Sequence, residues 1–230
     1  MIAVIRFQLS GYLRSVRALH PILALALLLA IVFSSPLGAT PAQVRHGALN
    51  ALGDLATLIF PICAWAARGL LDTEPDAQRH VSAVTAGRWR AISAGALAAY
   101  GFSAALAVVA PVYPMAEGAR NGLGAPVLLL GVALLLLSAL AATAVGGLTS
   151  RAVIPSPGTS ILVLLGVCAA NLLLGLGPLR GLTVPMIDWM RAAGHGPSAF
   201  ADAFPLLALR IVGWTAVAGA LYAWLRRTRP

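Results

Sequence analysis

The sequence contains six apolar runs, each close to the length that an α-helix needs to cross a lipid bilayer. Roughly 20 helical residues span the ~30 Å hydrocarbon core of a membrane. Because 60% of the 230 residues are hydrophobic and only 10% are charged, a soluble globule could not hide this apolar surface in one core. The sequence therefore predicts an all-α, polytopic membrane protein with one domain, 1–230. We place its six transmembrane helices at about 21–37, 48–71, 91–112, 127–148, 159–176 and 205–225.

Residues 1–19 predict a basic, amphipathic helix lying in the membrane interface, although a simple positive flank of the first span remains an alternative. Apolar residues recur at helical spacing, and basic or polar residues occupy another face. The first run also resembles a signal peptide, but the amphipathic stretch before it is long for such a segment, so we expect it to be retained. The apolar positions are Ile2, Ile5, Leu9, Tyr12, Leu13 and Val16, and the others are Arg6, Ser10, Arg14 and Arg17.

The distribution of arginine predicts the orientation of the chain. With a cytoplasmic N-terminus, 11 arginines lie in cytoplasmic segments and 4 lie outside, and Arg210 falls within the sixth span. Because cytoplasmic loops carry the excess of basic residues, we expect both termini in the cytoplasm and the chain in the plasma membrane. The net charge of +9 then reflects topology, and nucleic-acid binding is not expected because no compact basic face is present.

The basic residues exclude some chemistry, since all 16 are arginine and none is lysine. A phosphate-binding loop ending in Gly-Lys and a Schiff-base lysine are therefore both impossible. Cys63 and Cys168 each lie in an apolar run and are expected to act as small buried hydrophobes. We find no catalytic, cofactor-binding or metal-binding motif, so the chain is not expected to be an enzyme.

The segment 72–90 between the second and third spans is the most informative polar loop. Thr73 suits a helix cap, with Glu74, Pro75 and Asp76 in the first turn, followed by Arg79. A short capped helix parallel to the membrane would present a charged face to a partner protein. An ordinary solvated turn fits the local pattern equally well.

Polar residues inside spans are costly and mark candidate sites. Asp54, Asn171 and Arg210 fall at similar depth in the outer half of their spans. We predict that they form a polar cluster in which Asp54 pairs with Arg210. The alternatives are an ion pair with a purely structural role and a position at the membrane boundary that Arg210 reaches by snorkelling.

The segment 177–204 is the longest outer loop. Its apolar residues Val184, Ile187, Trp189 and Met190 fit a short amphipathic helix, with Trp189 as an anchor at the outer interface. A loop lying on the surface is the alternative.

The basic N-terminal helix, the six spans, the "TEPDAQRHV" loop and the short "SRAVIPSPGTSILVLL" turn together resemble the ABC-2 type permeases. These proteins are the membrane subunits of ABC exporters, and the similarity is greatest to small actinobacterial members. The resemblance covers essentially the whole chain. It depends on the order of the helices and on the kinds of residue in the loops, not on an invariant motif.

The resemblance implies a dimer of permease subunits driven by separate ATP-binding cassette subunits, which alone bind ATP. It also implies that 72–90 carries the coupling helix, with Glu74, Asp76 and Arg79 at the ATPase contact. The expected cargo is amphiphilic or lipid-like, and the permeases could form a homodimer or a heterodimer. A membrane anchor or accessory subunit without transport activity is the alternative function.

Overall fold

The structure is a computed structural model and describes residues 1–75, 84–85 and 87–228. Within these residues every regular element is a helix. The helices in chain order are α1 (Ile2–Leu13), η1 (Val16–Ala18), α2 (Leu19–Val32), α3 (Pro41–Leu71), α5 (Arg88–Val109), α6 (Val112–Arg120), α7 (Ala125–Leu148), α8 (Pro157–Leu176), η2 (Pro178–Leu182), α9 (Met186–Gly194) and α10 (Pro197–Thr228).

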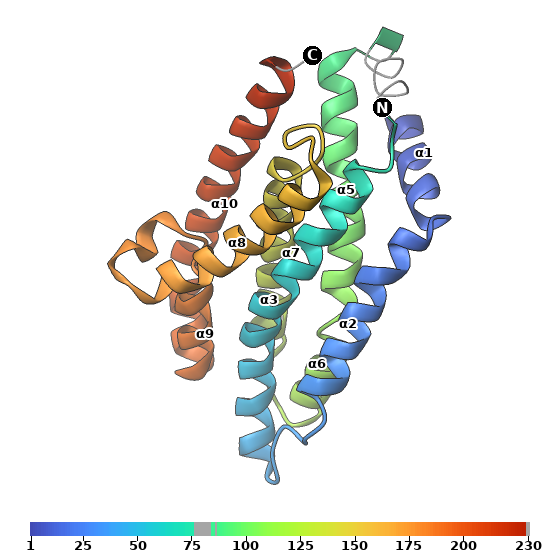
Figure 1. Ribbon diagram of the computed structural model, residues 1–230. Helices are drawn as coiled ribbons and strands as arrows, with labels where there is room; N and C mark the ends of the chain where they lie inside the picture. The colour runs from blue at the N-terminus through green and yellow to red at the C-terminus, as the bar shows by residue number, and fades with distance from the viewer. Residues whose placement is uncertain (76–83, 86, 229–230) are drawn as a thin grey trace.

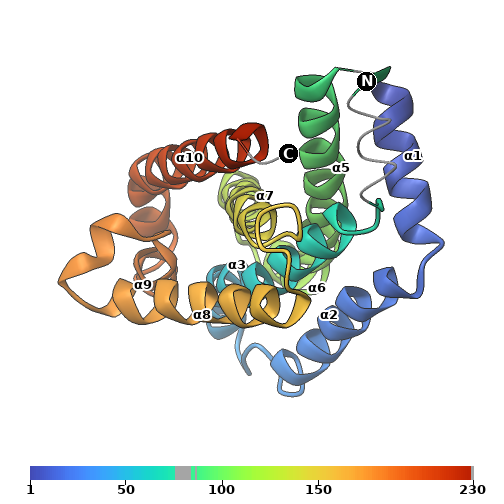
Figure 2. The same ribbon diagram turned by 45° about the horizontal axis from the view of Figure 1, so that its top comes forward.

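The long helices form a bundle around α3 and α7, which pack on each other more extensively than any other pair. Figure 2 shows these two helices in the middle, with α5, α8, α10 and α2 around them. The start of α1, the start of α5, the turn between α7 and α8 and the end of α10 lie at one end of the bundle (Figure 1). The short helix α6 lies at the opposite end.

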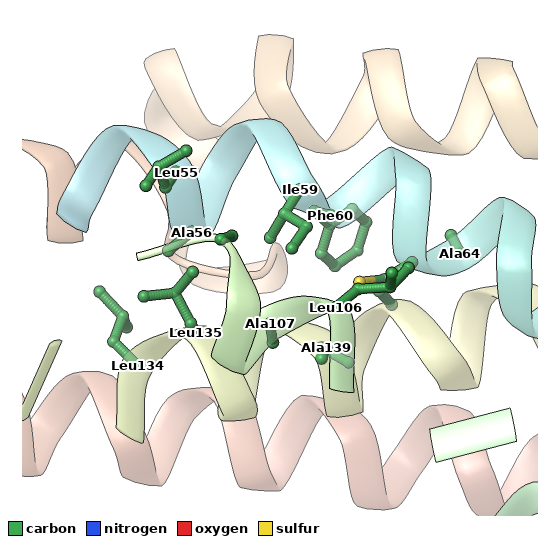
Figure 3. Packing of buried hydrophobic residues seen from close by; sticks show 14 of the residues in the cluster. Leu55, Ala56, Ile59, Phe60, Ala64, Leu106, Ala107, Leu134, Leu135 and Ala139 are labelled. Carbon is green, nitrogen blue, oxygen red and sulfur yellow. The ribbon is translucent and has the colours of Figure 1, made fainter. Parts of the chain in front are cut away.

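The core is apolar and closely packed. Ile59 and Phe60 of α3 face Leu106 of α5 and Leu135 of α7, and all four side chains are buried (Figure 3). Small residues allow the backbones to approach: a Cβ added at Gly146 of α7 would lie 2.5 Å from the carbonyl oxygen of Ala64. Close approach through glycine is how membrane helices gain packing energy when lipid is as apolar as the helix surfaces.

The prediction of an all-helical, multi-pass membrane protein is confirmed. Five of the described segments are long and apolar enough to cross a membrane: Pro41–Leu71, Arg88–Arg120, Ala125–Leu148, Pro157–Leu176 and Pro197–Thr228. A sixth crossing exists only if Ile2–Leu13 and Val16–Val32, which are bent by 82° relative to each other, count together as one span. The number six and the interfacial position of 1–19 therefore stay predictions.

The predicted first span, 21–37, is longer than its helix. The helix α2 ends at Val32 and has 14 residues, which cover only about 21 Å at the rise of an α-helix. Residues 33–40 form turns and bends instead, with Phe33 as the C-cap. Just after the helix the sequence reads Ser34, Ser35 and Pro36, and serine and proline favour a turn.

Other helices start earlier than the apolar runs predicted. The helix α3 begins at Pro41, not near residue 48, because Thr40 and Gln43 form a capping box that supports its polar first turns. Likewise α10 begins at Pro197, and Pro205 lies inside the helix. Hydropathy locates the membrane-embedded part of a helix, whereas caps determine where the helix starts.

Candidate functional site

A buried arginine lies at the end of α3, where the segment 72–90 begins. Arg68 is 7% exposed. Its Nε donates a hydrogen bond to Ser160 Oγ at 2.5 Å, and its Nη2 donates to the carbonyl oxygen of Pro157 at 3.4 Å. Its Nε also lies 3.8 Å from Asp72 Oδ2, one turn later on the same chain. A buried guanidinium requires such partners, so Arg68 ties α3 to the first turn of α8.

Asp72 extends these contacts to two further segments. Its Oδ1 accepts a hydrogen bond from the backbone N–H of Arg151 at 2.7 Å, in the turn between α7 and α8. Its carbonyl oxygen accepts from Arg17 Nη1 of η1 at 3.2 Å. Ser160 in turn donates to the carbonyl oxygen of Thr149. We call Arg68, Asp72 and Ser160 the α3 joint, because they connect η1, α3, the α7–α8 turn and α8.

The helix α1 is attached beside the α3 joint. Gln8 Nε2 donates to Glu74 Oε2 at 3.2 Å, and the buried ring of Tyr12 packs edge-to-face on Phe102 at 5.1 Å. The Tyr12 ring also covers Gly69, where an added Cβ would lie 3.3 Å from the Tyr12 hydroxyl. Burial raises the pKa of Tyr12 to about 12, against a smaller lowering effect of Arg17.

The predicted coupling residues are only partly visible. Glu74 is described and contacts α1 as above, while Asp76 and Arg79 lie outside the described residues. The hydroxyl of Thr73, predicted as a helix cap, donates back to the carbonyl oxygen of Gly69 at 2.9 Å. Thr73 therefore stabilises the last turn of α3.

The structure gives Arg210 a different acidic partner from the predicted one. Its Nη1 donates to Asp188 Oδ2 of α9 at 2.5 Å, and its Nη2 donates to the carbonyl oxygen of Arg180 at 2.6 Å. The predicted ion pair with Asp54 is therefore wrong. The prediction compared depths along spans only, whereas η2 and α9 bring Asp188 and the Arg180 carbonyl to Arg210 from the connecting segment.

The other two members of the predicted cluster have separate surroundings. Asn171 is buried, and its Oδ1 accepts from the backbone N–H of Val184 at 3.0 Å, which fixes the chain before α9. Its Nδ2 has no hydrogen-bond partner. Asp54 is half-buried on α3, one residue after Gly53, where α9 packs closely through Ala193. Arg210 and Asn171 thus both contact the segment 177–204, but at different residues.

Trp189 was predicted to anchor the chain at the membrane interface, but the structure places it in the core. A helix does form within the segment 177–204, at Met186–Gly194. The Trp189 side chain is fully buried, and its Nε1 donates to Thr57 Oγ1 of α3 at 2.8 Å. Together with the Arg210–Asp188 pair, this bond holds α9 against α3 and α10. The sequence suggested an amphipathic helix but could not tell whether its apolar face meets lipid or protein.

The α3 joint was missed at the sequence level, although a signal was present. Arg68 lies inside the apolar run 48–71, and an ionisable residue inside a span is a functional candidate by default. In the prediction of orientation, Arg68 contributes only a positive charge. An acidic residue four positions later, Asp72, fits the spacing of a helical ion pair. Ser160 carried no comparable signal, because a lone serine at the start of a span is common.

The contacts at the α3 joint hold four segments of the chain together. Among the described residues, no group of three or more His, Cys, Asp and Glu is placed to hold a metal ion. Cys63 is buried, as predicted, and its thiol contacts the carbonyl oxygen of Ser103 at 3.7 Å. Cys168, which was also predicted to be buried, is only half-buried.

Searches of family models, of curated proteins and of solved structures found no match to this chain.

Proposed function

We propose that this chain is the membrane-spanning permease subunit of an ABC-type exporter. In this proposal it has six spans, with α1 at the cytoplasmic interface and both termini in the cytoplasm. A separate ATP-binding cassette subunit binds and hydrolyses ATP, and a second permease subunit completes the complex in the plasma membrane. The cargo is amphiphilic or lipid-like. The layout of the sequence, which resembles the ABC-2 type permeases, is the basis of the proposal.

One structural observation supports it most: four segments meet where the segment 72–90 leaves α3. Asp72 contacts η1 and the α7–α8 turn, Arg68 contacts α8, and Glu74 contacts α1. A partner that displaces this segment would therefore act on several helices at once. Such an arrangement suits a subunit driven by an external ATPase, because in this proposal the nucleotide site belongs to the separate subunit.

Purification of the tagged full-length chain in mild detergent tests the proposal. We expect an ATP-binding cassette protein to co-purify in stoichiometric amount. Replacing Glu74, Asp76 and Arg79 together by alanine should weaken that association or uncouple ATP hydrolysis from transport, while membrane insertion is retained. Replacing Arg45, Arg180 and Arg191 by alanine, all predicted to lie outside, is the control and should leave the association unchanged.

Absence of any co-purifying ATPase would contradict the proposal. Co-purification of a complex without an ATPase would instead support the alternative, a membrane anchor or accessory subunit. If an ATPase co-purifies but the alanine variant at 74, 76 and 79 behaves as wild type, the coupling role of these residues is wrong.

A further inference from the structure

The side of α1 that points away from the bundle combines arginines with exposed apolar side chains. Ile2 is 83% exposed, Phe7 55% and Leu13 57%. Arg6 and Arg14, the C-cap residue of α1, are also exposed. Neither guanidinium has a hydrogen-bond or ion-pair partner among the described residues. We call these five residues the outer face of α1.

The opposite side of α1 fixes the helix in place. Tyr12 is buried against α5, and Ile5 and Leu9 pack on the core. Gln8 binds Glu74. The sequence-level assignment of all apolar residues of 1–19 to one membrane-facing side is therefore incomplete: some of them bind the bundle. The outer face of α1 is consequently held outward by contacts on the other side of the same helix.

The end of the bundle that carries α1 has a strong excess of positive charge. Figure 1 places α1, the start of α5, the α7–α8 turn and the end of α10 at this end, and η1 contacts the end of α3 there. Among the described residues, these segments hold nine arginines and two acidic residues, Asp72 and Glu74, whereas the other segments hold five arginines and four acidic residues. The nine are Arg6, Arg14, Arg17, Arg68, Arg88, Arg90, Arg151, Arg226 and Arg227. The other five are Arg45, Arg120, Arg180, Arg191 and Arg210, and the four acids are Asp54, Glu117, Asp188 and Asp202.

We propose that the outer face of α1 binds anionic phospholipid headgroups. Arg6 and Arg14 contact the phosphates, and Ile2, Phe7 and Leu13 insert at the boundary between headgroups and acyl chains. Nucleic acid or an acidic protein would match the arginines but would not require apolar side chains interleaved with them. An anionic lipid surface matches both kinds of residue at once. The inference does not depend on the transport function proposed above.

Lipid titration of the purified full-length chain, followed by native mass spectrometry, tests the inference. Wild type should bind phosphatidylglycerol more tightly than phosphatidylcholine. A basic residue near an anionic surface accounts for roughly a five-fold change in affinity, so replacing Arg6 and Arg14 by glutamine should weaken phosphatidylglycerol binding roughly 30-fold. Arg180→Gln with Arg191→Gln is the matched control, because it removes the same charge from two exposed arginines elsewhere. The control should bind both lipids as wild type does.

Phe7→Ser provides a second variant that keeps every charge. It should weaken binding of both lipids alike, by several-fold, and it tests the apolar part of the face even if the glutamine pair does not fold. Equal affinity of wild type for the two lipids would overturn the inference. An equal loss of phosphatidylglycerol affinity in the two glutamine pairs would also overturn it, because the attraction would then not be localised to α1. Unchanged lipid binding by Phe7→Ser would overturn it as well. Loss of a protein partner with unchanged lipid binding would assign the face to that protein instead.

Discussion

The candidate spans α3, α8 and α10 differ in their surroundings: other helices enclose α3, whereas most of α8 and α10 is exposed. In the most apolar stretch of α3 67% of the residues are buried, compared with 22% in α8 and 17% in α10. Mean hydropathy does not follow this order, since the value is 1.5 for α3, 1.6 for α10 and 2.2 for α8. The most buried span is thus the least apolar of the five. In a membrane the lipid is the apolar solvent, so burial within the protein goes with small and polar residues.

The contacts of each helix explain the difference. In α3, Gly53 meets Ala193 of α9, and Leu52 and Ala64 meet glycines of α7. The hydroxyl of Ser138 in α7 also donates to the carbonyl oxygen of Ala56 at 2.5 Å. In α10 only a narrow stripe is buried: Phe200, Leu207, Ile211, Ala218 and Tyr222. Most of the surface of α10 is therefore available to lipid or to another protein, and substitutions there should cost little.

The largest expected contrast is between two glycine-to-alanine substitutions. Gly146→Ala would place a Cβ 2.5 Å from the Ala64 carbonyl oxygen, so α3 and α7 must separate, at a cost of about 3 kcal/mol. Gly213→Ala in α10 meets nothing within 4 Å and should be stabilising by about 0.5 kcal/mol through helix propensity. Reversible unfolding in detergent micelles measures both. Equal effects of the two substitutions on the free energy of unfolding would contradict the contrast between the packed α3–α7 contact and the exposed surface of α10.

Substitution of Arg68 should have the next largest effect. Arg68→Gln removes the donors to Ser160 and Pro157 in a buried environment, and we expect a loss of about 2 kcal/mol in the free energy of unfolding. Arg151→Gln is the control: its backbone N–H still reaches Asp72 and the residue is exposed, so it should change stability by less than about 0.5 kcal/mol. If Arg68→Gln lowers the free energy of unfolding no more than Arg151→Gln does, the α3 joint does not stabilise the fold.

A smaller effect is expected for the pair that attaches α9 to α10. The Arg210 and Asp188 side chains are 25% and 21% exposed, so screening by solvent limits their coupling energy to about 1 kcal/mol. A double-mutant cycle with Arg210→Gln and Asp188→Asn measures this coupling from thermal unfolding. The cycle with Asp54→Asn in place of Asp188→Asn should give additive losses. Coupling of Arg210 to Asp54 instead would restore the sequence-level pairing and refute the geometry described above.

The sequence sufficed for the helical class and for the approximate positions of the spans, because lipid imposes a minimum apolar length on each helix. It did not locate helix starts such as Pro41, since capping by Thr40 adds polar turns that hydropathy ignores. It identified Arg210 and Asn171 as unusual but could not assign their partners, which come from α9 and the chain before it. Side-chain pairing across distant segments depends on how helices rotate and pack, and no local pattern encodes that.

The sidedness of five single cysteines, in a background with Cys63→Ala and Cys168→Ala, tests the six-span topology most directly. Six spans with cytoplasmic termini predict that an impermeant maleimide labels Ala39→Cys and Gly194→Cys in intact cells. Ala3→Cys, Pro75→Cys and Thr228→Cys should react only after permeabilisation. Labelling of Ala3→Cys together with Ala39→Cys would mean that the bent pair α1–α2 does not cross and that five spans remain. Labelling of Pro75→Cys and Thr228→Cys in intact cells, with Gly194→Cys protected, would invert the orientation and place the α3 joint away from any cytoplasmic ATPase.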